Sequence, residues 1–397
     1  MPREPETVDR EAREWYREQE GSLEHLAQLV EHAQGPSPRH AQHVCGGIPI
    51  YDGEASRRWI AEADRCRELQ SEWVAVLRDG AGAIVLRQAF ADTAPIDEAT
   101  AVFESIIRDE RSGGAGGADH FAKPGANDRI WNAQEKLCLR APEVFLRYFA
   151  NPLLMAVCEA WLGPAYQMTS QVNVVRPGGE AQLAHCDYHL GFQTVEQALR
   201  YPLHVHRMSA FLTLQGAVAH VDMPIESGPT KLLPFSQRFA QGYLAWRRPE
   251  MRDYFEAHFV QLPLHKGDAL FFNPALFHAA GANRTAEVSR MANLLQVSSA
   301  FGRAMEVLDR RRMCEAVYPA LRGARDAGGL SEAGLDAVIA ACAEGYAFPT
   351  HLDRDPPLQG LAPASQQDLL RQALEQNWSG TELARALSEH ARRRATD

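Results

Sequence analysis

Three residues of this chain have the types and the spacing of a metal site: His185, Asp187 and His278. His185 and Asp187 lie two positions apart in a stretch with strand-like composition, and side chains two apart on a strand point to the same face. Two imidazoles and one carboxylate on one side of an iron ion leave its other positions open, as oxygen chemistry requires. The pattern therefore predicts a non-heme iron site that His278 completes from a distant part of the chain.

Other residues near this pattern are weaker candidates for metal binding. Cys186 could ligate zinc as a thiolate, but strand alternation turns its sulfur away from the neighbouring ligands. His204 and His206 have strand spacing too, yet no Gly-Asp and histidine segment of their own follows them, and spacing alone is weak evidence. The seven cysteines contain no CxxC pair, and their odd number argues against a disulfide framework, so we expect reduced thiols.

The segments around the three residues carry a longer motif. His185-Cys-Asp187 is followed much later by Gly267-Asp-Ala-Leu-Phe-Phe-Asn-Pro-Ala-Leu-Phe-His278, and then by Arg290. In the combination of His-x-Asp, Gly-Asp-x-x-x-Phe-x-x-x-x-x-His and a downstream arginine, the chain resembles the phytanoyl-CoA dioxygenase family of Fe(II)/2-oxoglutarate-dependent oxygenases. The resemblance extends over roughly residues 70–300, which is the extent of the strand-rich block with its turns.

The resemblance implies a set of site residues. His185, Asp187 and His278 would be the ligands of Fe(II), with 2-oxoglutarate as cosubstrate, O2 as oxidant and ascorbate as a possible reductant. Because family halogenases lack the carboxylate ligand, the presence of Asp187 disfavours halogenation. The resemblance also implies a double-stranded β-helix fold.

A second group of residues is predicted to bind the cosubstrate. Arg290 would hold the distal carboxylate of 2-oxoglutarate in a bidentate pair, a role that suits the guanidinium geometry. Arg284 is the rival, but its turn-like surroundings favour exposure to solvent. Asn173 matches a family position that can hydrogen-bond the cosubstrate, and Thr213 is a weaker candidate that could equally satisfy barrel backbone.

These residues predict an oxygenase that hydroxylates an unactivated C–H bond of a small organic metabolite and releases succinate and CO2. Desaturation, epoxidation and ring formation remain open. The aromatic residues predicted to line the substrate pocket are Trp131, Tyr188, His189 and Phe192, although such residues near a barrel often belong to the core. The alternatives are a non-oxidative cupin-like metal-dependent lyase or isomerase, a metal- or ligand-binding module, and a catalytically silent barrel that mediates assembly.

One segment departs from the family pattern. Ser227-Gly-Pro-Thr keeps the family's turn, but its usual Pro-Gly-Ser-His ending is replaced by Pro234-Phe-Ser-Gln237. The missing histidine is not a metal ligand in the family, so we expect the change to affect the loop or substrate contacts and to leave the iron site intact.

The pattern of helical and strand-like segments predicts a mixed α/β (α+β) fold, in which these residues are positioned by a jelly-roll or cupin-like barrel with helices at both ends. We expect a helical wrapping segment over residues 1–80, the oxygenase domain over 81–300 and a C-terminal helical segment over 301–397. The predicted strands are 83–86, 167–175, 207–214, 259–264, 269–272 and 290–297, and the predicted helices include 59–77 and 142–162. Ser331 and Ser365 are predicted N-caps.

The composition of the chain limits which partners it can bind. With 397 residues, 45% of them hydrophobic, the chain can bury a large core, and its net charge of −10 offers no field for a phosphate backbone, which makes nucleic acid an unlikely partner. The N-terminus lacks the apolar segment of a signal peptide and no stretch is apolar enough for a membrane span, so we expect a cytoplasmic protein. The glycine-rich stretch at 111–118 lacks the ending of a phosphate loop. A homodimer is possible.

Overall fold

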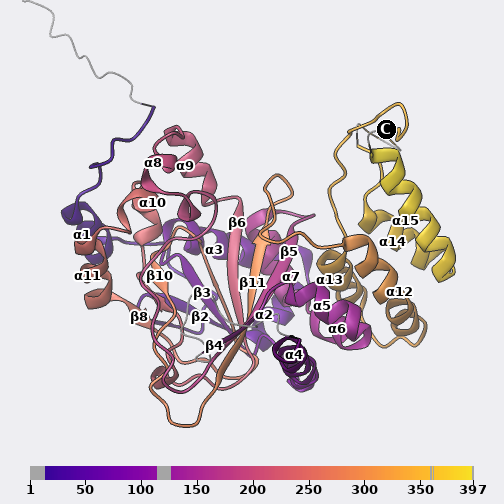
Figure 1. Cartoon of the computed structure of the whole chain (residues 1–397), viewed down its shortest axis with the longest axis horizontal. Coiled ribbons are helices and arrows are strands. Elements are labelled where there is room, and N and C mark those ends of the chain that lie inside the picture. Colours follow the sequence, from indigo (N-terminus) through magenta and orange to yellow (C-terminus); the bar gives the residue numbers. More distant parts are fainter. Residues whose placement is uncertain (1–13, 114–126, 358–359, 361, 396–397) are drawn as a thin grey trace, which may run out of the picture.

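The computed structural model of the chain describes residues 14–113, 127–357, 360 and 362–395. Most of the glycine-rich stretch at 111–118 lies outside these residues. The described chain forms two β-sheets enclosed by helices (Figure 1). Its double-stranded β-helix core, built on a central antiparallel sheet, confirms the predicted fold class.

The major sheet has eight strands in the order β1-β2-β3-β9-β6-β11-β5-β4, and all neighbours are antiparallel except β2 and β3. The minor sheet has three strands in the order β10-β7-β8. The strands of the major sheet are β1 (His43–Cys45), β2 (Ile48–Asp52), β3 (Ala83–Arg87), β4 (Asn127–Ile130), β5 (Gln167–Val175), β6 (Thr213–Ala219), β9 (Ala269–Phe272) and β11 (Arg290–Ser298). Those of the minor sheet are β7 (Lys231–Leu232), β8 (Val260–Gln261) and β10 (His278–Ala279).

Helices precede, interrupt and follow the strands. The N-terminal half contains α1 (Leu23–His32), α2 (Gly53–Ile60), α3 (Ala63–Asp79), α4 (Ala94–Ser112), α5 (Ala133–Arg140), α6 (Pro142–Phe149) and α7 (Pro152–Leu162). Between strands lie α8 (Val195–Ala198), α9 (Leu203–Ser209), α10 (Gly242–Ala245) and α11 (Pro249–His258). The C-terminal end adds α12 (Arg310–Asp326), α13 (Glu332–Cys342), α14 (Gln366–Glu375) and α15 (Gly380–Arg394).

Strand alternation divides the two faces of the major sheet. On β11, Met291, Leu295 and Val297 belong to the main hydrophobic core with α3, α7 and α12, whereas Arg290, Ala292, Leu294 and Gln296 line a cavity on the opposite face. Because side chains alternate along a strand, the apolar outer face packs on helices and the inner face is left for polar chemistry.

The structure changes several element boundaries. The predicted helix 59–77 is broken into α2 and α3, and the helix 142–162 is broken before Pro152, whose ring and missing N–H end α6. The predicted strand 207–214 is wrong in most of its length, because α9 runs to Ser209 and β6 begins only at Thr213. The predicted strand 259–264 is reduced to β8. The N-caps Ser331 and Ser365 are confirmed, each accepting a backbone N–H of its helix.

The N-terminal segment is not only a helical layer, since β1 and β2 extend the major sheet from within residues 1–80. One hydrophobic cluster joins α3, the outer face of the sheet and the C-terminal helices. The domain boundaries at 80 and 300 stay a prediction. Among the described residues no helix has the length and apolar character that crossing a bilayer requires.

Candidate active site

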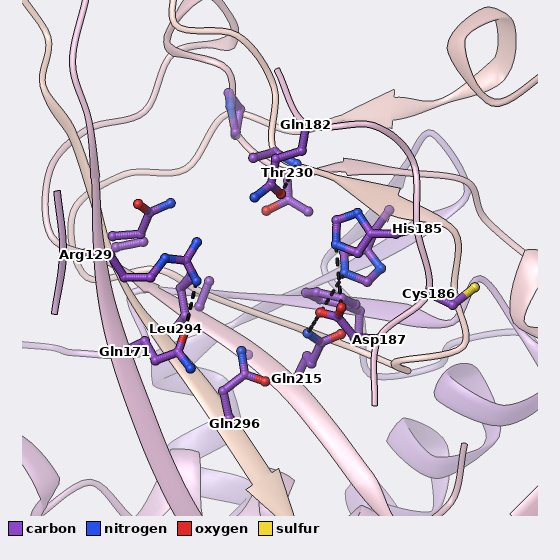
Figure 2. Close-up of a pocket in the computed structure, with 18 of the residues that line it drawn as sticks. Arg129, Gln171, Gln182, His185, Cys186, Asp187, Gln215, Thr230, Leu294 and Gln296 are labelled. Carbon is purple, nitrogen blue, oxygen red and sulfur yellow. Dashed lines mark hydrogen bonds and ion pairs between the residues drawn. The ribbon is translucent and has the colours of Figure 1, made fainter. Parts of the chain in front are cut away.

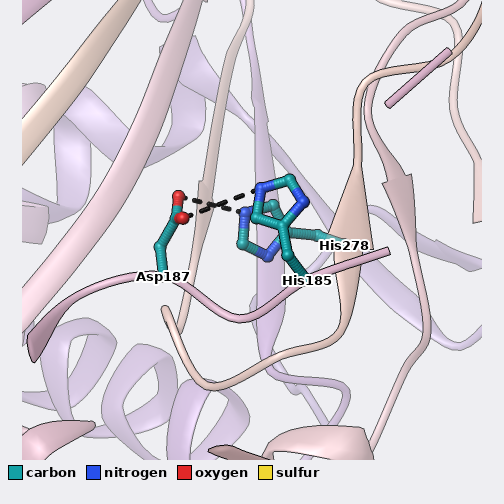
Figure 3. A group of neighbouring side chains, drawn as sticks. All are labelled: His185, Asp187 and His278. Carbon is teal, nitrogen blue, oxygen red and sulfur yellow. Dashed lines mark hydrogen bonds and ion pairs between the residues drawn. The ribbon is translucent and has the colours of Figure 1, made fainter. Parts of the chain in front are cut away.

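His185, Asp187 and His278 converge although His278 is far from the other two in sequence (Figure 3). One ligand atom from each lies within 4.8 Å of the others. His185 does not sit in a strand as predicted; it makes a single antiparallel bridge to His278, the first residue of β10. Its N–H donates to the His278 carbonyl at 2.9 Å and the His278 N–H returns the bond at 3.0 Å, so backbone pairing fixes the two histidines together.

Both imidazoles are held in one orientation by the same kind of contact. The Nδ1 atom of His185 is 2.8 Å from the Leu183 carbonyl, and Nδ1 of His278 is 2.8 Å from the Leu276 carbonyl. A carbonyl only accepts, so Nδ1 carries the proton and the lone pair of Nε2 faces the third residue. Burial lowers the pKa of His185, which favours this neutral state. Two Nε2 lone pairs are thereby available to a metal ion.

Asp187 faces both imidazoles. Its carboxylate oxygens lie 3.7 Å from Nε2 of His185 and 3.4 Å from Nε2 of His278, and Gln215 on β6 donates a hydrogen bond to it from Nε2. Burial alone would raise the pKa of Asp187, but His185, His278 and the Gln215 amide together lower it below the ordinary value. The group is therefore an anionic, oriented oxygen donor beside two imidazole nitrogen donors, a set suited to a non-heme ferrous ion.

The three residues lie on the wall of a cavity of about 580 Å³ between the two sheets. Residues from β4, β5, β6 and β11 supply its floor, and Arg129 and Gln171 lie across it from His185 and Asp187 (Figure 2). Arg129 donates from Nη1 to the Gln171 carboxamide at 2.9 Å. Volumes of about 300–1,000 Å³ are typical of sites for drug-sized ligands, so the cavity has room for an organic molecule beside a small cosubstrate.

Arg290 begins β11 and is buried in the cavity wall with 6% of its surface exposed. Its Nη1 donates to the carbonyls of Ser227 and Gly281 at 2.9 and 3.1 Å. No carboxylate among the described residues pairs with it, and burial lowers the pKa of Arg290 to about 10. A buried cation without an anion is costly, so this guanidinium is suited to receive an anionic ligand. The rival Arg284 is exposed.

The backbone around Arg290 requires a glycine. Gly228 has φ +74°, and a Cβ there would lie 2.3 Å from the Ala282 carbonyl oxygen and 2.5 Å from the Gly281 carbonyl. This close approach sets the Ser227 and Gly281 carbonyls beside each other, where both accept from Arg290.

The other two predicted cosubstrate residues differ in position. Asn173 on β5 lines the cavity, and its Oδ1 is buried without a hydrogen-bond partner. Thr213 at the start of β6 is fully buried and lies outside the residues that line the cavity. Their roles toward the cosubstrate stay predictions, and the position of Thr213 favours its structural interpretation.

The side chains of the weaker metal candidates do not join His185, Asp187 and His278, although Cys186 is among the residues that line the cavity. The Cys186 sulfur points away from His185 and Asp187 and lies 3.2 Å from the Ala275 carbonyl, as alternation predicts (Figure 2). His204 and His206 are on helix α9 rather than a strand, so they do not share a strand face, and Nε2 of His206 contacts the Ala198 carbonyl. Gln237, at the family's histidine position, donates to the Gly80 carbonyl at 2.8 Å outside the cavity and shapes the loop.

A model of the family described as Phytanoyl-CoA dioxygenase (PhyH) matches residues 66–292, more than half of the chain. The chain belongs to the phytanoyl-CoA dioxygenase family. Members are Fe(II)/2-oxoglutarate-dependent oxygenases, so the predicted family and the predicted class of cofactors are confirmed. The matched range contains all three residues of the metal pattern as well as Arg290.

The individual relatives have low sequence identity to this chain. The curated Dioxygenase andF of Emericella variicolor is 27% identical over 147 residues, which cover 35% of this chain and 45% of that protein, so the chain spans less than half the length of this relative. Among solved structures, the 2-oxoglutarate-dependent carbocyclase SnoK from nogalamycin biosynthesis is 19% identical with a TM-score of 0.45, covering 59% of this chain and 86% of that one. HygX from Streptomyces hygroscopicus is 15% identical with a TM-score of 0.38, covering 58% and 87%.

Sequence reasoning about this family member's pocket was partly wrong. Trp131 and Phe192 line the cavity as predicted, but Tyr188 and His189 do not; Tyr188 is buried and bonds Gln296. The cavity residues that the sequence did not reveal share no motif and come from β4, β5, β6, the C-terminal end of α10 and α11, respectively: Arg129, Gln171, Gln215, Trp246 and Arg252. The alternation of β5 and β6 could have indicated Gln171 and Gln215.

Proposed function

We propose that this family member hydroxylates an unactivated C–H bond of a small organic molecule in a reaction that consumes 2-oxoglutarate and O2 and yields succinate and CO2. The observation that carries the proposal is the convergence of His185, Asp187 and His278 on one wall of a cavity that also contains Arg290. The reaction balances, because one oxygen atom of O2 enters the new hydroxyl and the other enters succinate.

The residues present fit an iron ion and 2-oxoglutarate. The donor set of two imidazoles and an oriented carboxylate suits iron, and the buried Arg290 lacks an anion among the described residues. Once bound, iron and 2-oxoglutarate supply the activation of O2 and the oxidising power that removes hydrogen from carbon.

Each protein residue then has a task that follows from its position. The two histidines and Asp187 hold the ion from one side, Gln215 fixes the Asp187 carboxylate, and Arg290 holds the distal carboxylate of the cosubstrate. The sheet floor and the aromatic side chains Trp131 and Phe192 exclude bulk water and orient the target carbon.

A non-oxidative lyase or isomerase could use the same three ligands, but it would leave the buried Arg290 charge without a purpose. Asp187 supports hydroxylation over halogenation, because the carboxylate occupies the place that chloride would need.

The test is succinate release from purified protein on addition of Fe(II), ascorbate and 2-oxoglutarate. We expect release that requires both iron and oxygen, and we expect Asp187→Ala to lower it more than about 100-fold, beyond the 10–100-fold typical of changes around metal ligands. The matched control is Asp253→Ala, which removes an exposed carboxylate of α11. Full turnover by Asp187→Ala would refute the ligand assignment. Once a substrate is known, incorporation of one atom from ¹⁸O2 into product separates hydroxylation from desaturation or ring formation.

A further inference from the structure

The described lining of the cavity carries an excess of positive charge. Apart from Arg129, which has partners of its own such as Gln171, two guanidinium groups, those of Arg252 and Arg290, accompany a single carboxylate, that of Asp187. A bound ferrous ion adds two positive charges, and 2-oxoglutarate brings only two negative ones. A poorly solvated cavity with this balance favours a further anion.

Arg252 on α11 is, besides Arg290, a second guanidinium of the lining that has no carboxylate partner among the described residues. Its Nε is buried without a hydrogen-bond partner. The acid that would ordinarily pair with it one helical turn away is Glu256, but Glu256 is 2.6 Å from Lys231, which lies over the Phe259 ring. Among the described residues no carboxylate lies within ion-pair distance of Arg252.

A second cation lies close to Arg252. Both guanidinium groups contact one ring, with the guanidinium carbon of Arg252 5.4 Å and that of Arg247 4.0 Å from the ring centre of Trp246. The ring favours each cation, but the two like charges repel each other. Arg247 donates to the carbonyls of Tyr243, Gly191 and Gln193, so it has an evident structural task. Arg252 shares the neighbourhood of this second cation without any such bonds, an arrangement that an incoming anion would stabilise.

Arg252 is also close to the predicted reaction centre. The Trp246 ring that it contacts lies 6.4 Å from the His185 ring, and both Trp246 and Arg252 line the cavity. Helix α11 lies on the side of the minor sheet, near β8 (Figure 1). Arg252 is thus placed to bind the remote end of a substrate whose reactive carbon faces the metal residues.

The other two arginines have different positions and contacts. Arg290 is assigned to the cosubstrate, and Arg129 bonds Gln171 on the opposite side of the cavity (Figure 2). The lining also contains large apolar side chains, those of Trp131, Leu183, Phe192 and Met305. An aromatic or alicyclic molecule with one acidic group would match this combination of apolar wall and single cation.

We propose that the substrate is an organic carboxylate with an apolar ring body and that Arg252 binds its carboxylate. This inference rests on the proposed function for the positions of the metal and of 2-oxoglutarate. Under this proposal Arg252 is a specificity-determining residue that contacts the substrate but neither the metal nor the cosubstrate.

The experiment uses a panel of aromatic and alicyclic carboxylic acids, each paired with its neutral primary amide. Binding is measured by calorimetry to the full chain loaded with Ni(II) and 2-oxoglutarate, a combination that prevents turnover. We expect binders to be acids, their amides to bind at least tenfold more weakly, and Arg252→Met to weaken acid binding about 10- to 100-fold, as for the loss of a charged hydrogen-bonding partner. Arg252→Lys should recover part of the affinity.

Controls separate this proposal from the proposed function. Loading of Ni(II) and 2-oxoglutarate is titrated first in every variant, and a failure there counts against the metal and Arg290 assignments. Arg252→Met should load normally, as should Arg108→Met, which removes an exposed cation from α4 and should leave acid binding unchanged. The proposal is overturned if amides bind as tightly as acids, if Arg252→Met binds acids like the parent, or if no acid in the panel binds the loaded protein.

Discussion

Replacing Arg290 with glutamine should separate cosubstrate binding from folding. The guanidinium is 6% exposed and has no carboxylate partner among the described residues, while its Nη1 serves two carbonyls. Burial lowers the pKa of Arg290 from its ordinary value to about 10, which corresponds to a cost on the order of 3 kcal/mol for keeping the cation in the folded protein. This cost is present throughout the physiological range, because it disappears only when the pH rises above the lowered pKa.

The Arg290→Gln variant removes that cost but also weakens two charged hydrogen bonds, each contributing about 1.5–3 kcal/mol. A glutamine amide can still donate to one carbonyl. The opposing effects should nearly cancel, so we expect the free energy of unfolding of the metal-free protein to change by less than about 2 kcal/mol, measured by urea denaturation.

Binding of 2-oxoglutarate should change far more. Removing one member of a buried charged pair costs about 2–5 kcal/mol, which corresponds to a loss of affinity of about 30-fold to several thousand-fold. The assay is anaerobic titration of the Fe(II) protein with 2-oxoglutarate, followed by the visible charge-transfer band of the chelate. Arg284→Gln, which changes the exposed rival, is the matched control. Affinity within threefold of the parent for Arg290→Gln, or a large loss for Arg284→Gln, would refute the assignment.

Two further predictions concern residues behind the site. Burial raises the pKa of Glu306 to about 7, and its Oε2 is buried without a partner. The folded state therefore retains a proton that the unfolded state loses above its pKa of 4.5, and stability falls as the pH rises from about 4.5 to 7. Glu306→Gln should match the parent in urea denaturation near pH 4.5 and exceed it by about 1–3 kcal/mol at pH 8; an equal difference at both pH values would contradict the burial argument. Gly228→Ala should destabilise the fold by about 1–3 kcal/mol more than Gly328→Ala, because Gly328 also has a positive φ, of +62°, but open space around it. It should also weaken 2-oxoglutarate binding by displacing the carbonyls that hold Arg290, and equal effects of the two alanines in both measurements would count against this role.

The metal pattern and Arg290 could be predicted from sequence because, at these residues, the motif and the local backbone geometry point to the same arrangement. His185 and Asp187 need only lie on one side of an extended segment, and the bridge between His185 and His278 supplies this without a regular strand. The prediction of a strand over residues 207–214 is wrong for a different reason. Its alternating composition competes with the short helix α9 that packs against the N-terminal region, where Leu203 donates its N–H to the Glu14 carbonyl.

The substrate side of the cavity depends on register and could not be read from the chain. Gln296 on β11 pairs with Gln215 on β6, and Leu294 pairs with Gln171 on β5, so a slip of one residue would bury these carboxamides against the helical core and expose apolar side chains to the cavity. Trp246 and Arg252 come from helical turns between β7 and β8, whose path no motif specifies. The motifs common to the family are thus local in the sequence, whereas the residues that we propose to select a substrate are positioned by the packing of α10 and α11 beside the barrel. Exchange of that segment between relatives should therefore change which molecules bind while the binding of iron and 2-oxoglutarate stays the same.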